Sequence, residues 1–302
     1  MHSTFTNNNH IPIMLKEVIE ILNIRPGSNI IDLTTGGGGH LKEIAKKVGP
    51  TGIVIALDKD IKILKNHNIK NITKQYSCVK LNYDSFSNIE LILKKYKISK
   101  IDGILCDLGI SSNQLQDSTR GFTFKSNGPL DMRINQENDI TAYKMLRQIS
   151  IVNLTKIIHS FGNIHNANKI AKNIKTRITS NSIFSLINAI DINNNNKSKK
   201  LITSIFRALR MQVNNELGEL DKIFSILDNI LSKFGKAVFI TFHSLEDKIV
   251  KSNMLKYSQL INTENKNKWK ILFNKVITPN YQEMQTNSSC RSAKLRVIEK
   301  IN

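Results

Sequence analysis

The 302-residue sequence is poor in the features that mark secreted, membrane-spanning or metal-binding proteins. It has three cysteines, Cys78, Cys106 and Cys290, and no two of them have the spacing of a metal-binding pair. A low cysteine count is typical of a reducing compartment, and we therefore expect a cytoplasmic protein. Because the cysteine spacing forms no metal-binding pair, we also expect no metal site. No run of about 18 apolar residues occurs, and the polar N-terminus resembles no signal peptide, so we expect no membrane partner.

Acidic residues are scarce relative to basic ones. The 44 lysines and arginines outnumber the 24 aspartates and glutamates, which gives a formal net charge of +20 at pH 7. Such an excess attracts polyanions, and nucleic acid is the first partner that it predicts. The whole chain is also rich in Lys, Asn and Ile, and a bias in base composition would raise the charge in the same way without a nucleic acid partner.

Two common phosphate-binding motifs are missing. Four consecutive glycines, Gly36 to Gly39, are followed by His40, which is not the G-x-G-x-x-G pattern of dinucleotide-binding proteins. No Lys-Ser or Lys-Thr follows them, so a P-loop is excluded. The glycine spacing argues against a nicotinamide dehydrogenase, and a nucleoside ligand without a phosphate cradle fits better. S-adenosyl-L-methionine is the leading candidate for that ligand.

What is present is a strand, a glycine turn and a helix. The apolar run from Ile30 ends in Asp32, and after the glycines the residues Leu41, Ile44, Ala45 and Val48 recur at helical spacing. An open α/β sheet presents its backbone to a nucleotide-like ligand in this way. Glycine allows the main chain to approach where a Cβ atom would collide.

Two later apolar runs also end in aspartate. The run Ile53–Leu57 precedes Asp58, and the run Ile101–Cys106 precedes Asp107. An acidic residue about 20 residues after the glycine turn suits a ribose, because a carboxylate accepts from both hydroxyls. We therefore predict a pocket at one edge of a parallel sheet.

The pattern changes after Asp107. A long segment without clear periodicity, residues 108–133, is typical of a functional loop. Helical patterns follow from Asp139 to about Ile192, then an Asn-rich tract at 193–200 that we expect to be an exposed loop. One long helix is predicted, with apolar residues from Phe206 to Leu231 and its end at Gly235. The sheet resumes at Ala237–Phe242 and continues with Ile271–Ile277 and Ala293–Glu299. We therefore predict a sheet domain of residues 1–112 and 205–302 with an inserted helical domain of residues 113–204 on the substrate side.

A series of blocks in this order resembles the MraW family of small-subunit ribosomal RNA methyltransferases. The matching blocks are Asp32–His40, Asp107–Ser112, Arg120–Phe124, Gly128–Arg133, Ala208–Arg210 with Val213–Leu217, Phe242–Asp247 and Arg291–Arg296. The resemblance implies a Rossmann-like class I methyltransferase sheet with a helical insert. It implies methyl transfer from S-adenosyl-L-methionine to the N4 atom of a cytidine in the decoding region of 16S rRNA. It also implies cofactor contacts at Gly38, Gly39, His40, Asp58, Phe86, Asp107 and Gln114.

The chemistry suggests a role for Asp107. Cytosine N4 is a weak nucleophile because its lone pair is delocalised into the ring, and acceptors on its amino protons would localise that pair. Asp107 and the carbonyls of residues 108–112 are the candidate acceptors. We expect the sugar-phosphate backbone to run past four cations, Arg120, Arg133, Arg210 and Lys248, and leave open whether His243 contacts substrate or is structural.

The sequence leaves other hypotheses about function and oligomeric state open. The chain could be a catalytically silent RNA-binding factor for ribosome assembly, or a DNA cytosine-N4 methyltransferase. The long predicted helix could also carry a homodimer contact.

Overall fold

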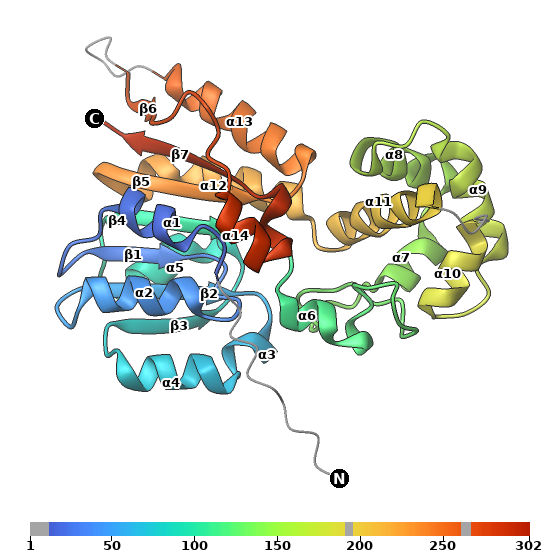
Figure 1. Cartoon of the computed structure of the whole chain (residues 1–302), viewed down its shortest axis with the longest axis horizontal. Coiled ribbons are helices and arrows are strands. Elements are labelled where there is room, and N and C mark those ends of the chain that lie inside the picture. The colour runs from blue at the N-terminus through green and yellow to red at the C-terminus, as the bar shows by residue number, and fades with distance from the viewer. Residues whose placement is uncertain (1–11, 191–195, 261–266) are drawn as a thin grey trace. The chain divides into compact units, whose positions relative to one another are not determined.

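The computed structural model describes residues 12–190, 196–260 and 267–302 (Figure 1). It divides into two compact units. The sheet unit is Met1–Gly109 with Glu219–Asn302, and the helical unit is Ile110–Gly218. The predicted domain boundary at residue 204 therefore differs from the observed division at Gly218. The reason is that Ile205, Phe206 and Leu209 are buried in the core of the helical unit. Among the described residues, no helix is long and apolar enough to cross a membrane.

The sheet unit is built on seven strands in the described part of the chain, in the order β3-β2-β1-β4-β5-β7-β6. The first five are parallel, and β7 is antiparallel to both of its neighbours. This is the Rossmann-like arrangement that the sequence predicted. The strands are β1 Asn29–Asp32, β2 Ile53–Asp58, β3 Val79–Tyr83, β4 Ile101–Asp107, β5 Leu231–Thr241, β6 Trp269–Ile271 and β7 Lys294–Lys300.

Helices cover both faces of this sheet. They are α1 Leu15–Leu22, α2 Gly39–Val48, α3 Ile61–Leu64, α4 His67–Gln75, α5 Ile89–Lys95, α12 Glu216–Ile230, α13 Ser244–Ser258 and α14 Tyr281–Thr286, with the 3-10 turns η1 Phe86–Asn88 and η3 Ser288–Ser292. Side chains alternate across a strand, so Ile30 joins the core under α1, α2 and α4 while Ile31 joins the core under α5, α12 and α13. The central strands β1, β2 and β4 are buried on both faces, which is why their sequences are nearly continuous apolar runs.

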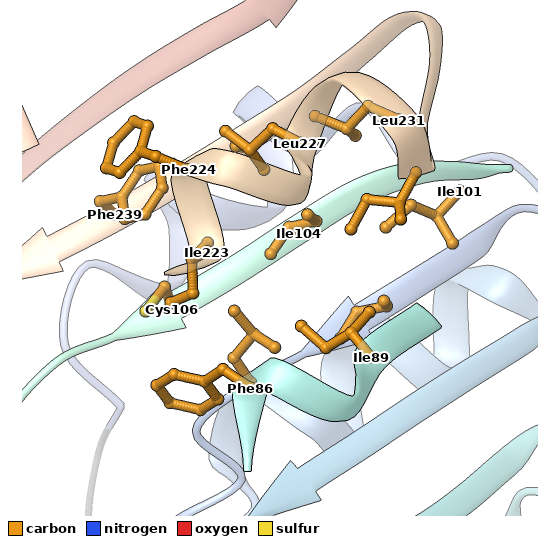
Figure 2. Close-up of a cluster of buried hydrophobic side chains, with 14 of the residues drawn as sticks. Phe86, Ile89, Ile101, Ile104, Cys106, Ile223, Phe224, Leu227, Leu231 and Phe239 are labelled. Atoms are coloured by element: carbon orange, nitrogen blue, oxygen red, sulfur yellow. The ribbon is translucent and has the colours of Figure 1, made fainter. Parts of the chain in front are cut away.

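The core under α5 and α12 contains a tight aromatic contact. Phe224 of α12 stacks on Phe239 of β5 with ring centroids 4.8 Å apart, and Leu227 lies one turn further along α12 (Figure 2). This packing anchors α12 on the sheet.

The helical unit contains α6 Ser112–Gln116, the 3-10 turn η2 Ser118–Arg120, α7 Ala142–Gln148, α8 Ile151–Gly162, α9 Ala167–Arg177, α10 Ile183–Ile190 and α11 Asn196–Val213. Thr141 and Ser150 cap α7 and α8 through their hydroxyls. The helical patterns predicted from Asp139 to about Ile192 are confirmed by α7 to α10, whose apolar residues, such as Leu154, Ile158 and Ile174, are buried. Residues 121–141, between η2 and α7, have no helix or strand, which confirms the second half of the predicted loop 108–133. The first half of that predicted loop contains α6 and η2 and needs correction.

The structure corrects the predicted long helix from Phe206 to Leu231. The chain instead forms α11 and α12, separated at Asn214 and Asn215. Asn215 has a φ of 47°, a left-handed conformation that interrupts a helix. The Asn214 side chain accepts from the Ile134 N–H and donates to the Met132 carbonyl, so tertiary hydrogen bonds hold the break open.

Two further expectations need correction. The Asn-rich tract was expected to be a loop, but Asn196 to Lys200 begin α11, while residues 193–195 lie outside the described residues. The predicted strand Ile271–Ile277 is the short β6, followed by a single bridge from Ile277 to Leu295. The apolar residues through which α11 joins the core, Ile202, Ile205 and Leu209, follow this polar start.

We predict that Leu227→Ala lowers the free energy of unfolding by about 2–5 kcal/mol, because it leaves a cavity in a closed core. Leu91→Ala is the matched control, since Leu91 lies on α5 with 64% of its surface exposed and its loss should cost no more than about 0.5 kcal/mol. Urea unfolding followed by circular dichroism measures both values. Equal losses in the two variants would contradict the packing described here.

Candidate functional site

Three aspartates end three neighbouring strands of the sheet unit. Asp32, Asp58 and Asp107 are the last residues of β1, β2 and β4. These strands are parallel and adjacent, with β1 between the other two. The carboxylates therefore share one edge of the sheet, as the sequence predicted.

The glycine turn lies at this same edge. Gly36 and Gly38 have φ values of 48° and 82°, which side chains other than glycine rarely adopt. A Cβ atom on Gly38 would lie 2.6 Å from Cδ1 of Ile69, and one on Gly39 would lie 2.7 Å from Cγ of Pro12. The turn therefore requires glycine for both its conformation and its packing.

Asp58 joins the turn to β2. Its Oδ2 accepts from the Gly36 N–H at 3.1 Å, and its Oδ1 accepts from the Asp60 N–H at 2.9 Å. Burial raises the pKa of Asp58 to about 6, while these backbone hydrogen bonds oppose the rise. At neutral pH Asp58 is a carboxylate, and each oxygen keeps a lone pair with which to accept from a hydroxyl.

Asp32 and Asp107 are linked through Thr34. Asp32 Oδ1 accepts from the Thr34 N–H at 3.1 Å, and Thr34 Oγ1 accepts from the Asp107 N–H at 2.7 Å. Asp32 Oδ2 and Asp107 Oδ1 are buried and have no hydrogen-bond partner among the described residues. Burial raises the pKa of Asp32 to about 7 and that of Asp107 to about 8, and repulsion from Asp32 adds to the rise at Asp107. Buried oxygens without partners at a strand end indicate a binding site for a donor or a cation.

His40 is held beside this pair by the main chain. Its Nε2 lies 3.0 Å from the Ile13 carbonyl oxygen, and its Nδ1 lies 3.8 Å from Asp107 Oδ2. Because a carbonyl only accepts, Nε2 carries the proton in this contact. His40 thus connects the segment before α1 to the Asp107 carboxylate.

Phe86 contacts Lys59, a residue at this edge of the sheet that the sequence analysis did not predict. Lys59 follows Asp58, and its Nζ lies 4.6 Å from the centroid of the Phe86 ring. Lys59 also pairs with Glu219 of α12 at 2.5 Å, and the Ser85 hydroxyl donates to Glu219 at 2.8 Å. Burial lowers the pKa of Lys59, and the bond to Glu219 opposes this. The adjacency of Lys59 to Asp58 was a usable signal, whereas nothing local in the sequence points to Glu219.

Gln114 belongs to the helical unit and caps α6. Its Oε1 accepts from the Ser111 N–H at 2.9 Å, and the Ser111 hydroxyl accepts from the Gln114 N–H at 3.3 Å. This reciprocal capping box fixes the side chain, which is buried.

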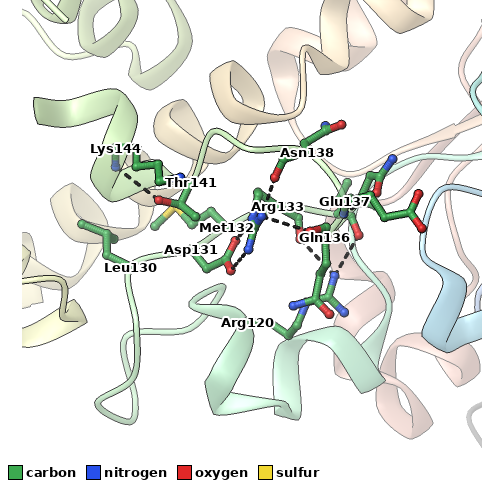
Figure 3. Close-up of polar contacts among 12 residues, drawn as sticks. Arg120, Leu130, Asp131, Met132, Arg133, Gln136, Glu137, Asn138, Thr141 and Lys144 are labelled. Carbon is green, nitrogen blue, oxygen red and sulfur yellow. Dashed lines mark hydrogen bonds and ion pairs between the residues drawn. The ribbon is translucent and has the colours of Figure 1, made fainter. Parts of the chain in front are cut away.

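Arg120 and Arg133 bond to the main chain of the segment that follows η2 (Figure 3). Arg120 is 2% exposed and donates to the carbonyls of Arg133 and Ile134, both at 2.9 Å. Arg133 forms a two-pronged ion pair with Asp131 and also donates to the carbonyls of Gln136 and Asn138. Both guanidinium groups thus have intramolecular partners that fold this segment.

The other three predicted substrate residues differ in exposure. Arg210 pairs with Glu216 through two bonds of 2.7 and 2.9 Å. His243 caps α13, because its Nδ1 accepts from the Glu246 N–H at 3.3 Å. Lys248 is exposed on α13 and is the one of the five predicted side chains that is open to solvent.

An open parallel sheet with a glycine turn after β1 and aspartates ending β1, β2 and β4 defines an α/β enzyme of the nucleoside-binding methyltransferase class. The chain belongs to the MraW methylase family, whose model matches residues 7–301. The resemblance noted in the sequence is thereby confirmed, and the predicted cofactor, S-adenosyl-L-methionine, agrees with a methylase family.

Curated relatives match over nearly their whole length. The chain is 35% identical to ribosomal RNA small subunit methyltransferase H of Clostridioides difficile, over 97% of this chain and 99% of that protein. It is 40% identical to the protein of the same name from Buchnera aphidicola, over 96% of this chain and 99% of that protein. Among solved structures, an rRNA methylase from Streptococcus thermophilus matches with a TM-score of 0.43 and 10% identity, over 95% of each chain.

We predict that Glu219→Gln destabilises the protein, by up to about 3 kcal/mol, because it leaves the Lys59 ammonium without its anionic partner. Lys59→Met should cost a similar amount, and the double variant should cost less than the sum, which a double-mutant cycle in urea measures. Lys222→Met is the control, since Lys222 bonds the same carboxylate but is about half exposed. Strict additivity of the two changes would contradict the pairing.

We predict that Asp107 contributes a loss of stability as the pH rises from about 4 to about 8. An acid whose pKa rises on folding, here from 3.8 to about 8, binds more protons folded than unfolded, so deprotonation favours the unfolded chain. Asp107→Asn should therefore flatten the dependence of the urea midpoint on pH and stabilise the protein most at the alkaline end. A variant with the slope of the wild type would refute this.

Proposed function

We propose that this chain transfers the methyl group of S-adenosyl-L-methionine to the N4 atom of a cytidine in the decoding region of 16S rRNA. The observation that carries the proposal is the shared edge of Asp32, Asp58 and Asp107 beside a glycine turn, in a chain of a methylase family. The relatives named above act, by their names, on small-subunit ribosomal RNA.

The residues at this edge fit the proposed cofactor. Asp58 has lone pairs for both ribose hydroxyls, and Gly38 and Gly39 present bare backbone. The buried, unpartnered oxygens of Asp32 and Asp107 suit the cationic methionine end. Phe86 is assigned to the adenine and His40 to a contact beside Asp107, and Gln114 of the helical unit stays a cofactor contact that the family resemblance implies.

When bound, S-adenosyl-L-methionine supplies an electrophilic methyl group on sulfur. The protein must hold the cytosine amino group in line with that carbon, since positioning carries much of such a transfer. Asp107 accepts a hydrogen bond from the amino group, which localises the lone pair on N4. As the new N–C bond forms and the S–C bond breaks, the surplus N4 proton passes to Asp107 or to water. A cation beside Asp107 favours its carboxylate form, which is the form that can accept.

The test is methyl transfer from tritiated S-adenosyl-L-methionine to small ribosomal subunits that lack this modification, followed by nucleoside analysis. We expect label in N4-methylcytidine for the wild type, and a rate at least about 100-fold lower for Asp107→Asn, because the acceptor charge is gone. Cofactor binding is measured in parallel by calorimetry, with Asp102→Asn at the exposed start of β4 as the control.

The outcomes separate the alternatives. Label in another nucleoside would refute the N4 assignment, and label in DNA but not in rRNA would favour a DNA cytosine-N4 methyltransferase. Cofactor binding without transfer to any tested nucleic acid would reject the proposed reaction. If the wild type does not bind S-adenosyl-L-methionine, the enzyme proposal is refuted and the catalytically silent assembly factor is the remaining hypothesis. A homodimer, a cytoplasmic location and the absence of a metal stay predictions.

A further inference from the structure

The middle of the helical unit has a one-sided charge. From Ile140 to Ile190 the sequence contains seven lysines and arginines and not one aspartate or glutamate. Several helices of the sheet unit mix the two signs, as in Lys16 and Glu17 of α1 or Lys42 and Glu43 of α2. The longest stretch without an acid in that unit, residues 61–83, is less than half as long. A general bias toward lysine would enrich every helix and would not remove acidic residues from one segment.

Five of these cations lie on two helices that touch. Lys169, Lys172 and Lys175 recur every three residues along α9, and Lys144 and Arg147 are three apart on α7. Residues at this spacing are neighbours on a helix surface. We call these five residues the basic strip.

Lys175 joins the two helices of the strip. Its ammonium donates to the carbonyls of Leu146 and Arg147 at the end of α7, at 2.8 and 2.9 Å. These acceptors are neutral, so the positive charge of Lys175 is held in place without being neutralised. Burial and the positive charge of Arg147 both lower the pKa of Lys175.

The remaining four members are exposed. Buried positions on α9, Ile170, Ala171 and Ile174, occupy the opposite side of the helix and face the core of the unit. The strip is thus a row of solvated cations on a rigid support, with no anionic side chain in the surrounding segment of sequence. Like charges arranged in this way repel one another, so the arrangement is favourable when an anion lies across it.

The predicted RNA-binding arginines do not supply such a row. Arg120, Arg133 and Arg210 are bonded to carbonyls or carboxylates within the helical unit. Lysine heads that remain hydrated and mobile are suited to phosphates as point charges.

We propose that the basic strip of α7 and α9 binds the sugar-phosphate backbone of the RNA substrate. This inference rests on the proposed function for the identity of the RNA. The strip contributes affinity and its salt dependence, and it carries no base specificity.

The experiment compares two variants of the full chain with equal charge. In the strip variant Lys144, Arg147, Lys169 and Lys172 become Gln, while Lys175 is kept because it caps α7. In the control variant four exposed lysines of the sheet unit, Lys46, Lys47, Lys74 and Lys94, become Gln. The probe is a fluorescent transcript of the 16S rRNA decoding region, and its affinity is measured against potassium chloride concentration.

We expect the strip variant to lower the slope of log affinity against log salt by about 2–3, since each lost phosphate contact removes about 0.7. The control variant should change the slope by less than half of that. Replacing the three lysines by Arg, with Arg147 replaced by Lys, should restore the wild-type slope. Both neutralised variants should bind S-adenosyl-L-methionine with unchanged affinity.

Equal slopes in the strip and control variants would overturn the proposal, because net charge alone would then explain the binding. An unchanged slope in the strip variant would also overturn it. The binding measurement needs no turnover, so a product other than N4-methylcytidine would refute the proposed function without affecting this result. Conversely, methylation of the expected nucleoside with equal slopes would leave the proposed function intact and remove the strip from it.

Discussion

The parallel pairing of β1 with β2 and β4 is the constraint on which the candidate site depends. Parallel neighbours end at the same edge, so this pairing alone brings Asp32, Asp58 and Asp107 together. The bond from the Gly36 N–H to Asp58 then fixes the glycine turn, and Thr34 connects the other two aspartates. A shift of one residue in the strand pairing would turn these side chains to the opposite face and break both links.

An ion pair between Lys59 and Glu219 stabilises the loop beside this edge of the sheet. Lys59 extends from the end of β2 over Phe86 and pairs with Glu219, so α12 is tied to the loop that holds the aromatic ring. Further along α12, Phe224 and Leu227 anchor the helix in the core. Apolar packing positions α12 on the sheet, and the ion pair from Glu219 to Lys59 positions Lys59 beside Phe86.

The helical unit contains cations that bond to its own main chain and cations that are exposed to solvent. A guanidinium has five donors in a fixed fork, so Arg120 and Arg133 can each hold several backbone carbonyls of a segment that has no helix or strand to satisfy them. Lysines on α7 and α9 remain at the surface, with the exception of Lys175, which joins the two helices. Exposure thus separates the cations that fold the unit from those proposed to contact RNA, and the second group includes Arg147.

The sequence by itself determined the order of strands and helices, the three aspartates at one edge and the membership of a methylase family. The order of elements and the shared edge follow from local signals, because apolar periodicity, a glycine run and an acid at each strand end are visible within a few residues. Membership of the family follows instead from the resemblance of whole sequence blocks and from the family model. Only the tertiary structure decided the break at Asn214 and Asn215, the partner of Lys59, and the burial of Arg120 and Arg133. Each of these depends on groups far apart in the chain, such as Asn214 and Met132 or Lys59 and Glu219, and no local pattern records which distant partner a side chain meets.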